Sequence, residues 1–451
     1  MSVMNLLNRV DACKARLRRV AVAQVSGTVN NLLGLVVEVE GLTGLAALGD
    51  RLELRTRENR SIQAEVIGFR GAAVQAMAYG TLDGLAHGSK VRLHNVYSAM
   101  LDVASSWLGR VIDPLGNPLD AAGVLFGGPV PRATRAAPPD ATTRARLGPR
   151  IDLGVRALDC FATCRQGQRL GLFAGSGVGK STLLSMLTRG TACDVVVLAL
   201  VGERGREVRD FIEEELGPEG LARSVVVVAT SDQPPLMRRQ CAYTAMTVAE
   251  HFRDQGKSVL LLMDSVTRFC LALREIGLSM GEPPATRGYP PSVFAELPRL
   301  LERAGPGPMQ PDGSAGHITG LFTVLVEGDD HNEPVADAVR GILDGHIVMD
   351  RKIAEAGRYP AIDVLRSLSR AASTCLNLEQ AAIIRRARGL LSLHGDMVDM
   401  VRLGAYKTGT DPAVDEALRL TPAIDNFLRQ APGERNGFDE SFQRLTQLLA
   451  G

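Results

Sequence analysis

Aromatic side chains are scarce in this sequence, and long apolar runs are missing. Phenylalanine, tyrosine and tryptophan make up 4% of the 451 residues. No apolar run approaches the roughly 20 residues that an α-helix needs to cross a bilayer. The first twenty residues are basic and amphipathic and lack the continuous apolar stretch of a secretory signal. We therefore expect a cytoplasmic protein that cannot conduct ions across a membrane by itself.

An excess of one charge is missing too, because 51 basic residues balance 50 acidic ones and leave a net charge of +1. This balance gives no global electrostatic footprint for nucleic acid. The seven cysteines are scattered, and no second Cys or His pair follows Cys160 and Cys164 at the spacing of a zinc site. We expect free, mostly buried thiols.

The pattern of residues changes along the chain, which is too long for one ordinary core. Residues 21–96 hold short strand candidates about ten residues apart, separated by glycine turns, which is typical of a small β-barrel or sandwich. Residues 97–375 alternate fully apolar strands with helix-like stretches, which predicts a parallel sheet covered on both faces. Residues 376–451 are helical in pattern. The strand candidates are 35–39, 51–54, 64–67, 74–77 and 91–93, then 170–173, 195–201, 225–229, 259–263 and 322–326.

A glycine-rich loop at 174–182, Ala-Gly-Ser-Gly-Val-Gly-Lys-Ser-Thr, follows one of these apolar strands and opens a helix-like run. This is the context of a phosphate loop, although Ala174 replaces the first glycine of the strict pattern. Its backbone amides can converge on phosphate oxygens at a helix N-terminus. We expect Lys180 to reach the β- and γ-phosphates of ATP and the Ser181 hydroxyl to ligate Mg²⁺. The predicted nucleotide-binding residues are Gly175, Ser176, Gly177, Val178, Gly179, Lys180, Ser181 and Thr182; the alternative is an ordinary glycine-rich turn.

Two carboxylates follow apolar strands in the same region. Asp264 ends the run 259–263 and, beside a phosphate loop, predicts a Mg²⁺ ligand acting through water, although alone it would suit a helix cap. Glu203 and Arg204 follow the run 195–201. Hydrolysis needs a carboxylate that orients water and cations that hold the charge on the γ-phosphate. Arg268 can face that phosphate as well. The alternatives are a solvated charged loop and a surface arginine.

These segments give the chain its resemblance to the β-subunit of rotary ATP synthases and to the related protein-export ATPases. The matching stretches are 174–182, 201–207, 262–268, 359–363 and 367–370. The resemblance implies that Glu203 is the catalytic carboxylate and that Arg204 and Arg268 contact the γ-phosphate. It also implies that Tyr359 packs on the adenine and that Arg370 is an arginine finger delivered into the neighbouring subunit's site. Without the resemblance, Tyr359 would be a core residue and Arg370 a helix-surface cation.

The same resemblance implies an α/β fold, a RecA-like P-loop ATPase core with a parallel sheet, between a small N-terminal β-barrel and a C-terminal helical domain. The expected boundaries are 1–20 for an amphipathic helix, 21–96 for the barrel, 97–375 for the ATPase core and 376–451 for the helical domain. Because a glutamate stands at position 203, the chain resembles a catalytic subunit rather than a non-catalytic one.

Within the family, 174–181, 281–294, 328–334 and 342–348 resemble type III export ATPases, and 294–305 and 442–449 resemble the flagellar branch. That branch implies a homohexamer at the cytoplasmic face of the inner-membrane export apparatus. It implies as partners a dimeric regulator bound by the N-terminal helix, a central stalk-like protein, the export gate, and export substrates with their chaperones. Peripheral contact of the basic N-terminal helix with anionic lipid is a further expectation.

Three alternatives stay open at this point. A virulence-type secretion ATPase shares most of these motifs. A hexameric RNA-translocating helicase would need an aromatic, basic surface on the barrel. The predicted barrel strands contain no aromatic residue, and Phe69 lies just beyond one of them, so we expect no nucleic-acid partner. A structural ring with inactive sites disagrees with the intact Lys180, Glu203 and Asp264.

Overall fold

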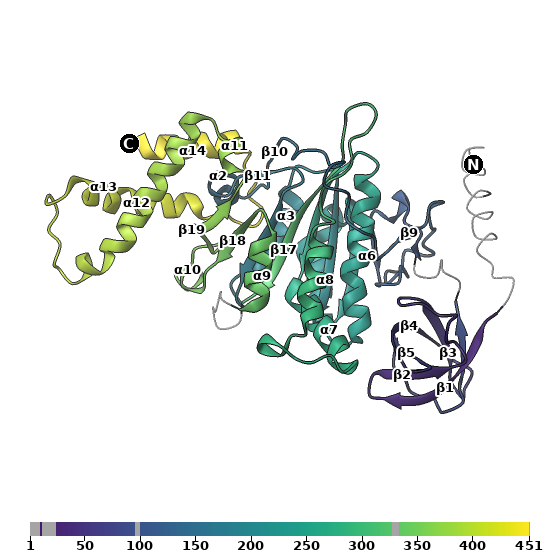
Figure 1. Ribbon diagram of the computed structural model, residues 1–451. Coiled ribbons are helices and arrows are strands. Elements are labelled where there is room, and N and C mark those ends of the chain that lie inside the picture. The colour runs from purple at the N-terminus through teal and green to yellow at the C-terminus, as the bar shows by residue number, and fades with distance from the viewer. Residues whose placement is uncertain (1–9, 11–23, 95–99, 327–332, 451) are drawn as a thin grey trace.

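The protein consists of a β-barrel, a central α/β domain and a helical domain, with the barrel and the helical domain at opposite ends (Figure 1). The computed structural model describes residues 10, 24–94, 100–326 and 333–450. The amphipathic helix expected at 1–20, apart from Val10, and most of the segment 328–334 lie outside the described residues. None of the described helices is long and apolar enough to cross a membrane.

The barrel is closed and antiparallel, with the strand order β1-β2-β5-β4-β3-β6. Its strands are β1 (Ser26–Leu33), β2 (Val36–Glu40), β3 (Arg51–Arg55), β4 (Ser61–Arg70), β5 (Ala73–Ala78) and β6 (Lys90–Leu93). The five predicted strands fall on β2 to β6. Strand β1 was not predicted, because its residues are mostly exposed and only Val29 is buried, so it lacks an apolar alternation.

The central domain is built on a nine-stranded sheet, with the order β19-β18-β12-β17-β15-β13-β14-β8 and with β16 paired to β17. Neighbouring strands are parallel except in the pairs β16–β17 and β18–β19. The strands are β8 (Arg110–Ile112), β12 (Arg169–Ala174), β13 (Val195–Glu203), β14 (Ser224–Thr230), β15 (Ser258–Asp264), β16 (Gly305–Pro306), β17 (His317–Leu325), β18 (Gly345–Met349) and β19 (Ile362–Ser369). The predicted parallel sheet is confirmed; the antiparallel edge strand β19 was not predicted.

Helices cover both faces of this sheet (Figure 1). Alternate residues of β13 enter two separate cores, one with α3 and the C-terminal helices and the other with α6 to α9. Around the sheet lie α2 (Arg156–Phe161), α3 (Lys180–Gly190), α4 (Gly205–Asp210), the π-helical turn η3 (Phe211–Leu216), α5 (Gly217–Ala222), α6 (Pro235–Arg253), α7 (Val266–Ser279), α8 (Pro291–Leu301), α9 (Pro334–Ile342) and α10 (Arg351–Glu355). Short elements are β7 (Met100–Leu101), η2 (Ser105–Trp107), β9 (Arg132–Ala133), β10 (Arg150–Ile151), β11 (Cys164–Arg165) and η4 (Thr286–Gly288).

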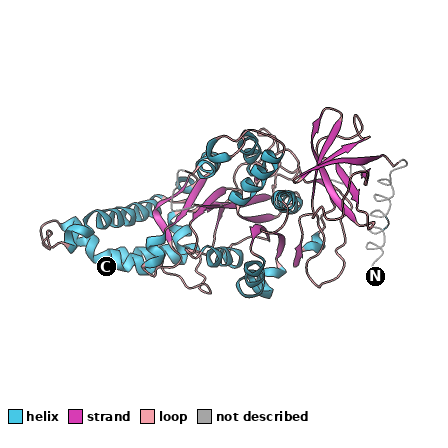
Figure 2. Ribbon diagram, turned by 90° about the horizontal axis from the view of Figure 1, so that it is seen from below, coloured by secondary structure: helices cyan, strands magenta, loops and turns pink. Residues whose placement is uncertain are grey.

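The C-terminal end is entirely helical, as Figure 2 shows. It consists of α11 (Ala372–Cys375), α12 (Leu378–Arg402), α13 (Pro412–Leu428) and α14 (Phe438–Ala450). The buried Arg156 of α2 joins it to the central domain, because its guanidinium donates to the Phe427 carbonyl at 2.9 Å and to Asn436 Oδ1 at 2.7 Å. The cysteines within the described residues are free, and four of them are buried, as expected.

One buried arginine ties residues 133–138, a linker that follows β9, to the central domain. Arg303 is 1% exposed and lies beyond the end of α8. Its guanidinium donates to both carboxylate oxygens of Glu250 at 2.8 and 2.7 Å and to the Thr134 carbonyl at 2.6 Å. Each charge compensates the other where water cannot reach, so neither can be removed alone without leaving a buried unpaired charge.

We predict that Arg303→Met lowers the free energy of unfolding by about 3–5 kcal/mol, because Glu250 stays buried without its partner. Urea unfolding followed by circular dichroism measures this loss. The exposed Arg299 of α8 supplies the control, and Arg299→Met is expected to change stability by less than about 1 kcal/mol. Adding Glu250→Leu to Arg303→Met should restore most of the lost stability; an equally unstable double variant contradicts the interpretation.

Candidate nucleotide-binding site

The glycine-rich loop joins β12 to α3 at the edge where the parallel strands β13, β15 and β17 also end. Gly177 and Gly179 have φ angles of 77° and 86°, a left-handed conformation that side chains rarely adopt. Gly179 is the N-cap of α3, and Lys180 is the first residue of that helix. The loop therefore presents backbone N–H groups at a helix N-terminus, which favours a bound anion.

Lys180 reaches from this loop across the sheet to Asp264 at the end of β15. Its Nζ lies 2.6 Å from Asp264 Oδ1, and the same oxygen accepts a hydrogen bond of 2.7 Å from the Thr323 hydroxyl of β17. Asp264 and Thr323 are buried. The two contacts fix the carboxylate of Asp264 within the edge of the sheet and beside the loop.

Glu203 enters the same site because β13 bulges at its end. The pairing register with β14 shifts between Val201 and Glu203, and Gly202 has a φ of 69°. A bulge re-aims the side chain that follows it. Glu203 is 7% exposed, its Oε1 lies 3.6 Å from Lys180 Nζ, and it forms a close ion pair with Arg268 of α7.

A cavity of about 720 Å³ lies over these groups. It is lined by the loop residues Gly175, Ser176, Gly177, Gly179, Lys180, Ser181 and Thr182, by Glu203, Arg204, Glu207, Arg268, Leu325 and Val326, and by Arg351. Four of these side chains are cations, and a nucleotide carries a compensating polyphosphate. The cavity brings together the predicted Lys180, Ser181, Glu203 and Arg268, with Asp264 directly behind Lys180.

The other predicted residues lie at the rim of the cavity or outside its lining, and the predicted loop residue Val178 is buried and does not line it. The Arg204 side chain is 76% exposed at the rim and pairs with Glu207 at 2.7 Å. Tyr359 is half-exposed and covers the loop: a Cβ atom at Gly179 would lie 3.2 Å from two of its ring carbons. Arg370 is exposed just beyond β19, and within the described part of the chain its side chain makes no hydrogen bond or ion pair. It does not line its own cavity.

Sequence reasoning missed Thr323 and Arg351. Arg351 of α10 donates from Nη2 to the Ser176 carbonyl at 3.1 Å, which connects the loop to a helix far along the chain. No local pattern indicates that contact. Thr323 carried a usable signal, since a hydroxyl inside a fully buried apolar strand needs a hydrogen-bond partner.

Comparison with known proteins agrees with this geometry. Residues 154–369 match the nucleotide-binding domain of the ATP synthase alpha/beta family, and residues 29–94 match its β-barrel domain. Residues 376–447 match the C-terminal domain of the type III secretion ATPase EscN. A flagellum-specific ATP synthase of Caulobacter vibrioides is 52% identical over 96% of this chain and 98% of its own length. The chain belongs to the ATP synthase alpha/beta family, in its flagellum-specific branch.

Other members support the same placement. The flagellum-specific ATP synthase of Bacillus subtilis is 46% identical over 94% of each chain. The assembled ATPase EscN of enteropathogenic Escherichia coli superposes with a TM-score of 0.86 at 40% identity, covering 94% of this chain and all of the other. The predicted three-part fold, the ATPase activity and the nucleotide as its ligand are therefore confirmed for this family member.

Thr323 is predicted to position Asp264 for catalysis. Replacing its hydroxyl in Thr323→Val leaves Asp264 with Lys180 alone, and we expect kcat to fall by about 10- to 100-fold while nucleotide still binds. Steady-state ATPase assays and titration with a fluorescent nucleotide measure the two quantities.

The matched control is Thr319→Val in the same strand, where an equally buried hydroxyl accepts a hydrogen bond from the Gly167 N–H at 3.1 Å. It removes a similar group far from the site, so kcat should change little. Equal losses of kcat in both variants would mean that the Thr323 hydroxyl stabilises the fold and does not position Asp264.

Proposed function

We propose that this chain hydrolyses ATP to drive or assist protein export through a flagellar type III secretion apparatus, and that it works as a homohexameric ring. The observation that carries the proposal is the position of Glu203, buried beside Lys180 and Arg268 at the mouth of a phosphate loop. The resemblance to rotary ATP synthases implies that catalytic subunits have a glutamate at this position and that non-catalytic subunits lack it.

Each residue has a role that follows from its place. The amides of the loop and Lys180 hold the β- and γ-phosphates. A phosphate oxygen then replaces Asp264, which is the partner of Lys180 in this structure. Arg268 then contacts the γ-phosphate, and Glu203 orients the attacking water. Arg204 closes the cavity from its rim, and Tyr359 stacks on the adenine beside the loop.

The oxygen donors at the site fit Mg²⁺. The Ser181 hydroxyl and the Asp264 carboxylate are hard ligands, and Mg²⁺ commonly takes one or two such ligands and fills its shell with water and substrate phosphates. Among the described residues no cluster of three His, Cys, Asp or Glu side chains could hold a metal alone, which agrees with an ion delivered together with the nucleotide. Bound there, Mg²⁺ would neutralise charge on the phosphates.

The proposed assembly follows the relatives. The structure of assembled EscN has been solved in complex with its central stalk EscO. The EscN chain of that structure superposes on this chain with a TM-score of 0.84 at 39% identity. We propose a corresponding stalk-like partner at the centre of a ring of this chain. The dimeric regulator, the export gate, the export substrates with their chaperones, and the place at the cytoplasmic face of the inner membrane belong to the same proposal.

The flagellar role is tested in a flagellated bacterium from which the gene for its own flagellum-specific ATPase has been deleted, so that it no longer swims. Wild-type protein should restore swimming in soft agar, and the purified protein should hydrolyse ATP in vitro. Glu203→Gln should bind MgATP with near wild-type affinity yet lose at least about 100-fold in kcat, because the water loses its orienting carboxylate.

Glu203→Gln is the matched negative control for complementation, since it keeps the shape and the fold. An active enzyme that restores secretion by an injectisome but not swimming would assign the chain to the virulence-type system. RNA-stimulated hydrolysis with filter binding of single-stranded RNA would favour the helicase instead.

Arg370 is predicted to act in the neighbouring subunit's site. It is exposed beyond β19 and absent from the lining of its own cavity. An arginine finger stabilises charge that develops in the transition state, so Arg370→Ala should spare nucleotide binding and slow turnover by about 1,000-fold or more.

Mixing Arg370→Ala with Glu203→Gln separates a role in trans from a role in cis. In random closed rings about one interface in four receives both intact residues, so the mixture should regain activity that neither variant has alone. Native mass spectrometry verifies that mixed rings form. If mixed rings form but recover no activity, Arg370 acts in the site of its own subunit or has only a structural role. The exposed Arg366 of β19, the strand that precedes Arg370, offers a control, Arg366→Ala, that should need no complementation.

A further inference from the structure

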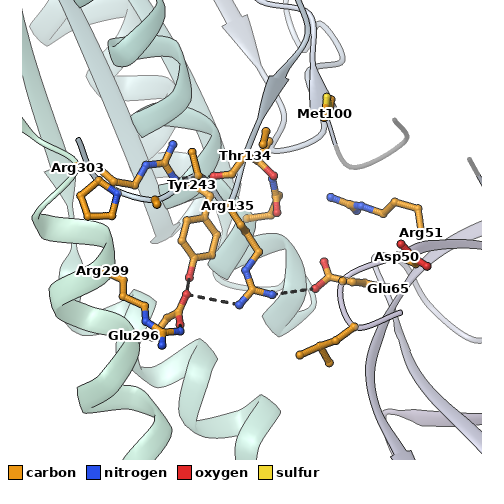
Figure 3. A pocket seen from close by; sticks show the side chains of 17 residues that line it. Asp50, Arg51, Glu65, Met100, Thr134, Arg135, Tyr243, Glu296, Arg299 and Arg303 are labelled. Atoms are coloured by element: carbon orange, nitrogen blue, oxygen red, sulfur yellow. Dashed lines mark hydrogen bonds and ion pairs between the residues drawn. The ribbon is translucent and has the colours of Figure 1, made fainter. Parts of the chain in front are cut away.

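A second cavity lies where the barrel meets the central domain (Figure 3). Its volume is about 600 Å³. Side chains reach it from the barrel, from the linker at 133–138, and from α6 and α8. It shares no lining residue with the nucleotide cavity.

Most of the charges around this junction cavity compensate one another. Glu65 of β4 accepts hydrogen bonds from Arg239 of α6 at 2.7 and 2.8 Å. Arg135 of the linker lies between Glu65 at 3.7 Å and Glu296 of α8 at 3.5 Å, as the dashed lines in Figure 3 show. These pairs hold the barrel, the linker and the central domain together. The Nε atom of Arg239 is also buried without an acceptor, but Arg239 does not line the cavity.

Arg51 of β3 is the exception. It is 6% exposed, and its Nε and Nη1 atoms are buried without a hydrogen-bond partner. Its guanidinium packs over the Tyr79 ring, 4.1 Å from the centroid, and points into the gap between barrel and linker in Figure 3. A buried N–H group without an acceptor is unfavourable, and more so when the group is charged. The cavity therefore holds an unsatisfied cationic donor.

Gln240 of α6 supplies an unsatisfied acceptor in the same cavity. Its Nε2 donates to the Thr244 hydroxyl at 3.2 Å, and that hydroxyl donates its own hydrogen to the Pro114 carbonyl at 2.5 Å. The amide orientation is therefore fixed, and the buried Oε1 has no partner. Gln240 and Arg51 also both line an adjoining cavity of about 150 Å³. A ligand that satisfies both needs an anionic oxygen for Arg51 and an O–H for Gln240.

The balance of charge points to an anion as well. The lining cations are Arg51, Arg135, Arg299 and Arg303, and the lining anions are Asp50, Glu65 and Glu296, which leaves an excess of one positive charge. Counting their buried partners Arg239 and Glu250 adds one charge of each sign and leaves that excess unchanged.

We propose that this junction cavity binds an oxyanion that carries a hydroxyl group, of which hydrogen phosphate is the smallest. Arg51 donates to its anionic oxygens, and its hydroxyl donates to Gln240 Oε1. Because Arg51 belongs to the barrel and Gln240 to the central domain, the bound anion bridges the two and slows their separation. The site is distinct from the nucleotide site and does not depend on the proposed export function.

Hydrogen exchange measured by mass spectrometry on the full chain tests this proposal and resolves the two anion sites by sequence. Samples in sodium phosphate, sodium sulfate and sodium chloride are compared at equal ionic strength and pH 7. In phosphate, amides at 49–55 and 133–138 should exchange about threefold more slowly or better than in chloride, because binding suppresses local opening. The phosphate loop at 175–182 should respond to phosphate and sulfate alike and serves as the internal control. Sulfate has no hydroxyl at this pH, so it should protect the junction less than phosphate.

The variants assign the effect to particular side chains. Arg51→Met keeps the aliphatic packing over Tyr79 and should abolish the phosphate-dependent protection at the junction while the loop still responds. Arg51→Lys should retain part of it. Arg55→Met, in the same strand but paired with Glu53 away from the cavity, should retain all of it. Gln240→Leu should remove the preference for phosphate over sulfate.

Each comparison is made between salts within one variant, so a change in the baseline stability of the barrel does not obscure the result. Identical junction exchange in phosphate and chloride, while the loop responds, would overturn the proposal. So would protection that persists in Arg51→Met, or equal protection by phosphate and sulfate.

Discussion

The common direction of β12, β13, β15 and β17 is the constraint on which the rest of this protein depends. Parallel strands all deliver their carboxyl ends to one edge of a sheet, and ligands of such sheets bind outside that edge. In this chain the edge receives the glycine-rich loop, Glu203, Asp264 and Thr323 from four separate segments. Antiparallel pairing of any one of them would carry its polar end to the opposite side of the domain.

The polar groups at this edge are arranged so that none of the charges is buried alone. Lys180 pairs with Asp264, and Glu203 pairs with Arg268. Buried ion pairs add little net stability, because desolvation offsets much of their attraction. Their contribution here is position, since each cation is held where a phosphate oxygen can replace the carboxylate as its partner.

The two ends of the molecule are attached by buried arginines rather than by apolar contact alone. Arg239 reaches from α6 to Glu65 in the barrel, and Arg156 reaches from α2 to the Phe427 carbonyl of α13 and to the Asn436 side chain between α13 and α14. A small apolar cluster that includes Ile67 and Met237 supports the barrel junction. An arginine offers several donors in a fixed plane, so one side chain can specify the angle between two domains. At the barrel junction, two N–H donors of the Arg51 guanidinium have no acceptor in the described part of the protein.

The sequence by itself determined the elements and the chemistry that each one carries. Continuous apolar runs predicted β12 to β15 and β17, and the strand–glycine loop–helix order predicted a phosphate-binding loop, because both signals are local. The pattern did not reveal β1, whose residues are mostly exposed, or β19, whose alternation belongs to an antiparallel edge strand. Resemblance to a family supplied predictions that spacing could not, namely the roles proposed for Tyr359 and Arg370.

Only the tertiary structure decided how those segments meet. It placed Thr323 on Asp264, aimed Glu203 through a bulge at Gly202, and set Arg351 against the loop from 175 residues away. It also joined β3 of the barrel to α6 around the junction cavity, where Arg51 and Gln240 lie. Contacts of this kind depend on strand order and domain packing, which arise from the burial of the whole chain. No window of sequence contains them, because the partners are brought together only when the sheet and its covering helices are complete.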